Sequence, residues 1–346
     1  MSTTKTRPAD VQNLRPAASP TSASMSFESV KQLVSDDLRL VDQAIRQRLA
    51  SDVVLVNQVA EYIVGSGGKR LRPMVTVVAA RACGCADDRY PEAAAIIEFI
   101  HTATLLHDDV VDGSQLRRGR DTANSVWGNE ASVLVGDYVY SRAFEMMVSL
   151  GSMRIMDVMA SATNKIAEGE VLQLMNAHDP ETTEQRYFEV IYRKTAKLFE
   201  AGAQIAAILA RSSPTIETAM STYGRHLGTA FQLIDDVLDY RADREQLGKN
   251  LGDDLAEGKP TLPLIYALKH GSPQQRQTIE HSIREGSTAE LASITSAIES
   301  TGGLAYTARL ARREASAAIE ALAELPDSAY KQALRDLANF SVERSH

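Results

Sequence analysis

Residues 105–112 read Leu-Leu-His-Asp-Asp-Val-Val-Asp, and residues 233–239 read Leu-Ile-Asp-Asp-Val-Leu-Asp. Both stretches contain the pattern Asp-Asp-x-x-Asp within apolar segments whose spacing is typical of an α-helix. On a helix, the first and last aspartates of such a cluster lie one turn apart on the same face, as Asp108 and Asp112 do. Two carboxylates at this spacing can share one divalent cation or hold two neighbouring ones.

The surroundings of the two clusters distinguish a metal site from an ordinary acidic surface. A single cluster of this kind is as often a solvated acidic face or a set of helix caps. Here Leu, Ile and Val flank both clusters, and like charges in an apolar wall are costly unless cations compensate them. Oxygen ligands without nearby cysteine favour magnesium over zinc. We therefore expect the clusters to face each other across a cavity and to bind magnesium.

Helical periodicity continues along almost the whole chain from Ser26. Alternating strand patterns and hairpin turn signals are missing, and abundant Ala and Leu favour helices. We predict one all-α domain over residues 26–346, preceded by a disordered tail at residues 1–25 that is rich in Ser, Thr, Pro and Ala. The predicted helices span about 27–49, 53–64, 73–84, 90–113, 130–149, 152–177, 182–211, 214–242, 261–270, 274–285, 288–300, 303–323 and 327–343.

The overall composition excludes several classes of protein. The net charge of -8 argues against a nucleic-acid binder, which normally has a basic surface. No run of about 18 apolar residues is present, so we predict no transmembrane segment. The tail has no apolar secretion segment and its prolines would break an amphipathic targeting helix, so we expect a cytoplasmic protein. Cys83 and Cys85 are too few for a disulfide framework and are interpreted as small apolar residues.

Basic residues accompany the acidic clusters and suit the oxygens of a diphosphate, because Arg offers forked donors and Lys a compact charge. Residues 67–69 read Gly-Gly-Lys but lack the G-x-x-x-x-G-K-[ST] pattern of a P-loop. His101 lies two helical turns before Asp108 on the same face and is a candidate substrate contact. The candidate diphosphate-binding residues are Lys69, Arg70, Arg72, Arg117, Arg118, Lys194 and Lys249.

Together these motifs resemble the trans-type polyprenyl diphosphate synthases over nearly all of residues 27–346. The resemblance implies a bundle of mostly antiparallel helices around a deep central cavity, assembled as a homodimer. It implies the sequential head-to-tail addition of isopentenyl diphosphate to an allylic prenyl diphosphate, with farnesyl diphosphate as the expected primer. The stretches that carry it are Gly-Gly-Lys-Arg-Leu-Arg-Pro (67–73), Glu98 to Gly119, Lys194-Thr195, Phe231 to Asp239, and Gly248 to Thr261.

The resemblance also implies a role for each matching residue. Three magnesium ions are expected with substrate bound, and the metal ligands would be Asp108, Asp112 and Asp235. The other residues assigned to catalysis are Asp109, Asp236, Asp239, Lys194 and Thr195. The allylic substrate would also contact Arg117, Gln232 and Lys249. The isopentenyl diphosphate pocket would consist of Lys69, Arg72, His101 and Arg118.

The length of the product is expected to depend on residues just before the first cluster. In the family that the chain resembles, bulky aromatic residues four or five positions before the first Asp shorten the product. Here these positions are Thr104 and Ala103, so we expect the cavity to be open at that level. Met147 and Met159 are expected farther down, near its floor. We expect a product of about forty carbons for quinone side chains, delivered at the membrane surface.

Three alternative functions stay open. A short-chain synthase that makes farnesyl or geranylgeranyl diphosphate would share the catalytic residues, although the small Ala103 disfavours it. A terpene cyclase has a related helical fold and one acidic cluster, whereas this chain has two. A non-catalytic partner subunit would be expected to lack aspartates or the Arg117-Arg118 pair, which are present here.

Overall fold

The computed structural model describes residues 26–65, 68–117, 119–241 and 252–344. Within these ranges the chain is almost entirely helical, which confirms the predicted all-α fold. None of the described helices is both long enough and apolar enough to cross a bilayer. The elements are α1 (Phe27–Leu33), α2 (Ser35–Leu49), α3 (Val54–Gly65), α4 (Leu71–Ala82), α5 (Tyr90–Val111), β1 (Leu116–Arg117), β2 (Arg120–Asp121), α6 (Ala123–Trp127), α7 (Asn129–Ser149), α8 (Met153–Asn176), α9 (Glu184–Ile191), the π-helix η1 (Tyr192–Ala196), α10 (Lys197–Leu209), α11 (Pro214–Leu238), α12 (Asp253–Ala256), α13 (Leu262–His270), α14 (Pro273–Glu285), α15 (Leu291–Thr301), α16 (Gly303–Ala321), the 3-10 helix η2 (Leu322–Glu324) and α17 (Ala329–Glu343).

The structure differs from the predicted helices in a few places. The segment 27–49 is two helices, because the backbone changes direction at the buried Val34. The segment 182–211 contains a π-helical turn that no local residue pattern marks. The short antiparallel pair β1–β2 was not predicted, since strands of two residues are too short to show alternation. The predicted tail at residues 1–25 lies outside the described residues.

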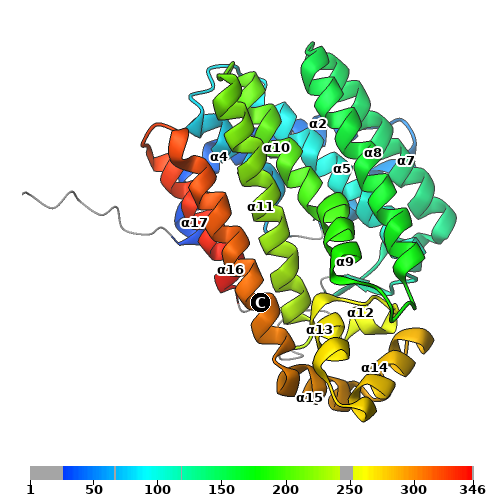
Figure 1. The fold of residues 1–346 in the computed structure, drawn as a ribbon. Coiled ribbons are helices and arrows are strands. Elements are labelled where there is room, and N and C mark those ends of the chain that lie inside the picture. Colours follow the sequence, from blue (N-terminus) through cyan, green and yellow to red (C-terminus); the bar gives the residue numbers. More distant parts are fainter. Residues whose placement is uncertain (1–25, 66–67, 118, 242–251, 345–346) are drawn as a thin grey trace, which may run out of the picture.

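Long helices form the body of the molecule, and the shorter helices α12, α13, α14 and α15 lie together at one end of it (Figure 1). The main hydrophobic core includes the fully buried side chains of Phe99, Phe199 and Tyr223. A separate apolar cluster holds α13, α14 and α15 together next to the end of α11. The last turns of α5 and α11 therefore end between the long helices and this smaller group.

Glycines in α11 bring it unusually close to the segment that contains η1 and α10. A Cβ atom at Gly224 would lie 2.4 Å from the carbonyl oxygen of Phe199, and one at Gly228 would lie 2.6 Å from the Cα of Ala196. Real Cβ atoms do not approach backbone atoms this closely, so only glycine permits the spacing. The packing of α11 thus fixes the position of η1.

We predict that Gly224→Ala destabilises the protein by about 1–3 kcal/mol, because the added methyl group meets backbone that cannot move aside independently. Urea denaturation followed by circular dichroism measures the difference. Gly65→Ala is the matched control, since a Cβ at Gly65 meets no atom within 4 Å. Equal midpoints for Gly224→Ala and the wild-type chain would contradict the close-packing argument.

Candidate active site

Both acidic clusters line one cavity of about 640 Å³. Asp108 and Asp112 come from the last turn of α5, where Asp112 is the C-cap residue, and Asp239 is the C-cap residue of α11. The C-terminal end of a helix carries a partial negative charge, so two such ends add to the charge of the carboxylates. The predicted arrangement of two clusters across one cavity is therefore present.

The cavity wall is strongly charged, and acidic groups predominate. Among the described residues, ten carboxylic acids and seven Lys or Arg side chains line it. The acids are Glu98, Asp108, Asp112, Glu170, Asp235, Asp236, Asp239, Asp253, Asp254 and Glu257. The bases are Lys69, Arg70, Arg72, Arg117, Lys194, Lys259 and Arg344. An excess of carboxylates favours the binding of cations in the cavity.

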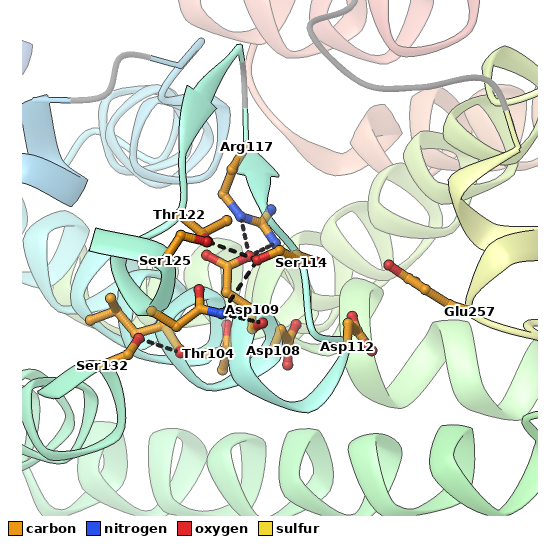
Figure 2. Close-up of polar contacts among 12 residues, drawn as sticks. Thr104, Asp108, Asp109, Asp112, Ser114, Arg117, Thr122, Ser125, Ser132 and Glu257 are labelled. Atoms are coloured by element: carbon orange, nitrogen blue, oxygen red, sulfur yellow. Dashed lines mark hydrogen bonds and ion pairs between the residues drawn. The ribbon is translucent and has the colours of Figure 1, made fainter. Parts of the chain in front are cut away.

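Asp109 differs from the other two aspartates of its cluster because it is fully buried and faces away from the cavity lining. Figure 2 shows Arg117 contacting Asp109 from the β1–β2 hairpin, while Asp108 and Asp112 lie on the side toward Glu257. The Arg117 Nη2 atom lies 2.6 Å from Asp109 Oδ1. Burial raises the pKa of Asp109, whereas the ion pair with Arg117 acts in the opposite direction. The same ion pair connects the β1–β2 hairpin to α5.

Lysine side chains pair with Asp108 and Asp112, the two partly buried aspartates of the first cluster. Lys194 Nζ lies 3.3 Å from Asp108 Oδ2, and Lys259 donates to Asp112 Oδ2 at 2.9 Å. Lys194 also donates to Glu170 at 2.6 Å, and burial raises the pKa of that glutamate to about 7 although Lys194 opposes the change. Each carboxylate of the first cluster is thus already paired with a positive charge.

The π-helix η1 presents Lys194 and Thr195 to the cavity. A Cβ at Gly169 of α8 would lie 2.8 Å from the backbone nitrogen of Lys194, so α8 and α11 enclose this turn closely from two sides. A π-helical turn has an extra residue in its hydrogen-bonded ring, and such turns occur frequently at functional sites. Packing by glycine therefore holds an irregular turn at the site.

The second cluster is held by different partners. Arg344, just after α17, lies 2.8 Å from Asp235 Oδ1, and its guanidinium stacks on the Phe231 ring at 3.7 Å. Asp236 is only 2% exposed, and both of its oxygens accept hydrogen bonds. Burial raises its pKa to about 8, while the donors Tyr187 and Gln232 act in the opposite direction. Asp235, Asp236 and Asp239 all line the cavity, and Asp236 is the most buried of the three.

The residues expected to bind isopentenyl diphosphate lie together at the cavity wall. Lys69, Arg72 and His101 all line it, and Arg72 Nη1 is 3.2 Å from His101 Nε2. Among the residues expected at the allylic substrate, Arg117, Lys194, Thr195 and Gln232 line the same cavity. Arg118 and Lys249 lie outside the described residues. The described substrate candidates are thus gathered around one space.

The candidates for chain length are divided between the cavity and the core. Thr104 lines the cavity and donates to the His101 carbonyl oxygen at 2.8 Å. Ala103, Met147 and Met159 are fully buried in the core and do not line this cavity. The structure therefore places Thr104, rather than Ala103, at the open level below the first cluster.

Sequence reasoning gave no role to four residues that the structure brings to the site, namely Tyr187, Glu170, Lys259 and Arg344. Lys259 follows a glycine within the stretch that carries the family resemblance, which was a usable signal. Glu170 and Tyr187 stand in ordinary helical patterns. Arg344 lies more than a hundred residues from Asp235 in sequence, and no local pattern connects the two.

The oxygen donors at this site suit a hard divalent cation such as magnesium. No group of three or more His, Cys, Asp or Glu side chains in the described ranges is arranged to hold a metal ion alone. Magnesium commonly takes only one or two carboxylates and completes its coordination with water and substrate phosphates. The pair Asp108 and Asp112 opposite Asp235 fits that mode of binding.

The fold and site define an all-α protein whose acidic cavity is suited to phosphate-bearing substrates. The polyprenyl synthetase family model matches residues 53–300. Octaprenyl diphosphate synthase of Escherichia coli (strain K12) is 55% identical over 321 residues, which cover 92% of this chain and 99% of that protein. The crystal structure of a polyprenyl synthase from Caulobacter crescentus CB15, complexed with calcium and isoprenyl diphosphate, has a TM-score of 0.90 and 45% identity, covering 94% of this chain and all of that one. The chain therefore belongs to the polyprenyl synthetase family and is a prenyltransferase.

We predict that Arg117→Ala destabilises the protein by about 3–5 kcal/mol, because it leaves the buried Asp109 carboxylate without its cation. Urea denaturation measures the loss. In an Asp109→Asn background the same substitution should cost much less, since no buried charge is left unpaired. Arg39→Ala is the control, because its ion pair with Asp36 is exposed and should contribute nothing measurable. Additive losses for Arg117 and Asp109 would refute the pairing.

Proposed function

We propose that this chain is a long-chain trans-polyprenyl diphosphate synthase. It adds isopentenyl diphosphate units head to tail to an allylic diphosphate, with farnesyl diphosphate as primer and a product of about forty carbons for quinone side chains. One observation carries the proposal: residues of both aspartate clusters and all of the basic candidates that the structure describes line the same cavity. The relatives support the long product, since the similar E. coli protein is an octaprenyl diphosphate synthase and a 46% identical protein of Rhodobacter capsulatus is an all-trans-nonaprenyl-diphosphate synthase.

The charge of the wall gives a reason for a metal requirement. A diphosphate is itself anionic, and the described wall already carries more carboxylates than Lys and Arg side chains. Asp108, Asp112 and Asp235 would hold magnesium ions, three in all with substrate bound. When bound, magnesium supplies the positive charge that stabilises the departing diphosphate. The calcium in the structure of the C. crescentus relative shows that a hard cation binds that homologous protein.

Side chains of this protein stabilise both groups that the ionisation produces, the diphosphate and the allylic cation. Lys194 and Lys259 lie beside the first cluster and can donate to diphosphate oxygens as the allylic C–O bond breaks. The Thr195 hydroxyl and the Gln232 amide oxygen are polar acceptors on the same wall, where the allylic cation needs support. Leu71, Leu105 and Phe231 line the cavity and exclude water from that cation. The double bond of isopentenyl diphosphate then attacks, and the released diphosphate takes the proton that is lost.

The proposed cytoplasmic enzyme acts as a homodimer and releases its product at a membrane surface. Apolar side chains on α7 and α8 are exposed in the single chain, which is typical of surfaces that pair with another subunit. They are Leu134, Val148, Met153, Val171, Leu174 and Met175.

The proposal is tested by incubating the purified full chain with farnesyl diphosphate, labelled isopentenyl diphosphate and magnesium, and by sizing the prenyl products. We expect a ladder that ends at about forty carbons, with activity lost on addition of EDTA and restored by magnesium. Labelled products that stop at twenty carbons would identify a short-chain synthase, because farnesyl diphosphate already has fifteen. Full activity without a divalent cation would refute the metal role, and no activity from the chain alone would favour a partner subunit.

We predict that Thr104→Phe shortens the product, because the aromatic ring would enter the cavity one helical turn below Asp108. The same labelled-product assay measures chain length. Thr104→Val is the matched control, since it has nearly the same shape and should leave the product long. An unchanged ladder for Thr104→Phe would show that the growing chain follows another route.

A further inference from the structure

Three consecutive hydrogen bonds connect α9, α11 and η1 at the cavity wall. Tyr187 donates its hydroxyl to Asp236 Oδ2 at 2.5 Å, and Gln232 Nε2 donates to Asp236 Oδ1 at 2.9 Å. Thr195 in turn donates its hydroxyl to Gln232 Oε1 at 2.9 Å. All four residues line the cavity that contains both aspartate clusters.

Burial makes this chain of hydrogen bonds well defined. Asp236 and Tyr187 are 2% and 5% exposed, so water offers few alternative partners. The Tyr187 ring is fixed by an edge contact with Phe188 and lies in an apolar cluster with Leu233 and Ile234. Hydrogen bonds to a buried carboxylate are stronger than those between neutral groups. The hydroxyl of Tyr187 is therefore a rigid donor rather than a rotating one.

The Asp236 carboxylate determines which group is the donor in each of these three hydrogen bonds. In its ionised form Asp236 accepts at both oxygens, so the Gln232 amide must turn its NH₂ group toward it. That leaves the amide oxygen for Thr195, which must then donate its only hydroxyl hydrogen. The lone pairs of the Thr195 oxygen are left for other directions, including the cavity. Without an anchored carboxylate, the amide would have two nearly equivalent orientations and the hydroxyl would follow either.

We propose that Tyr187 is a positioning residue that, through Asp236 and Gln232, keeps the lone pairs of Thr195 turned toward the allylic cation. This inference rests on the proposed function, because the cation forms only in that reaction. A fixed dipole that presents its negative end stabilises positive charge as it develops, whereas a hydroxyl hydrogen in its place would oppose it. The effect should act on the transition state more than on the bound substrate.

The test uses Tyr187→Phe in the full-length chain with magnesium present. We expect kcat to fall about tenfold or more while KM for isopentenyl diphosphate changes by less than about twofold. Binding gives a second readout, measured by calorimetry with two analogues of the allylic substrate. An ammonium analogue, whose charge stands where the cation forms, should bind about tenfold more weakly, and an uncharged thiodiphosphate analogue should bind as before.

Tyr306→Phe is the matched control. It also removes a tyrosine hydroxyl that donates to a carboxylate of α9, since Tyr306 binds Glu184 at 2.8 Å, but Tyr306 does not line the cavity. It should change neither kcat nor the preference between analogues. In a Thr195→Val background, Tyr187→Phe should lower kcat no further, because its effect passes through the Thr195 hydroxyl.

The outcomes separate this inference from the proposed function. A wild-type chain that makes no prenyl product refutes the proposed function. If the wild-type chain is active, either of two results overturns the positioning role. In the first, Tyr187→Phe weakens the binding of both analogues equally. In the second, Tyr187→Phe lowers kcat as much in the Thr195→Val background as in the wild-type chain. If Tyr187→Phe does not fold, Asp236→Asn tests the same series of hydrogen bonds, because an amide in place of the carboxylate no longer accepts at both positions. It should then alter the preference between analogues, and an unaltered preference overturns the inference.

Discussion

The structure depends on compensating negative charge at one place. The C-terminal ends of α5 and α11 bring their carboxylates and their helix dipoles to the same cavity, and the described wall contains more acids than bases. Lys194, Lys259 and Arg344 already pair with Asp108, Asp112 and Asp235. Like charges held this close in a partly apolar wall would otherwise drive the helix ends apart. The packing of these helix ends therefore depends on the cationic side chains placed beside them.

Charge compensation also divides the aspartates of each cluster into two kinds. Asp109 and Asp236 are buried and bind protein donors. Three of the less buried aspartates, Asp108, Asp112 and Asp235, line the cavity beside Lys or Arg. A carboxylate whose oxygens serve Arg117 or Tyr187 fixes the scaffold and leaves the cavity-facing aspartates to the substrate side. Each Asp-Asp-x-x-Asp pattern therefore supplies one buried aspartate that binds protein donors and less buried aspartates that line the cavity.

Much of this could be predicted from the sequence, because its strongest signals are local. Helical periodicity predicted the long helices, and the repeated pattern placed Asp108 and Asp112 on one face of α5. The η1 turn could not be predicted, since no local pattern marks it and its close neighbours are glycines of α8 and α11, which are distant in sequence. The partnership of Arg344 with Asp235 likewise arises from the tertiary fold. Contacts between distant segments leave no trace in a single local pattern.

The chain-length residues show what helical geometry adds to a prediction from side-chain size. Thr104 and Ala103 precede Asp108 by four and five residues, and both are small enough to suit an open cavity. A helix advances about 100° per residue, so the residue four before Asp108 stays near its face while the residue five before is turned well away. The structure agrees, with Thr104 on the cavity wall and Ala103 fully inside the core. Side-chain size alone could not separate the two positions, but helical geometry combined with the direction of Asp108 does.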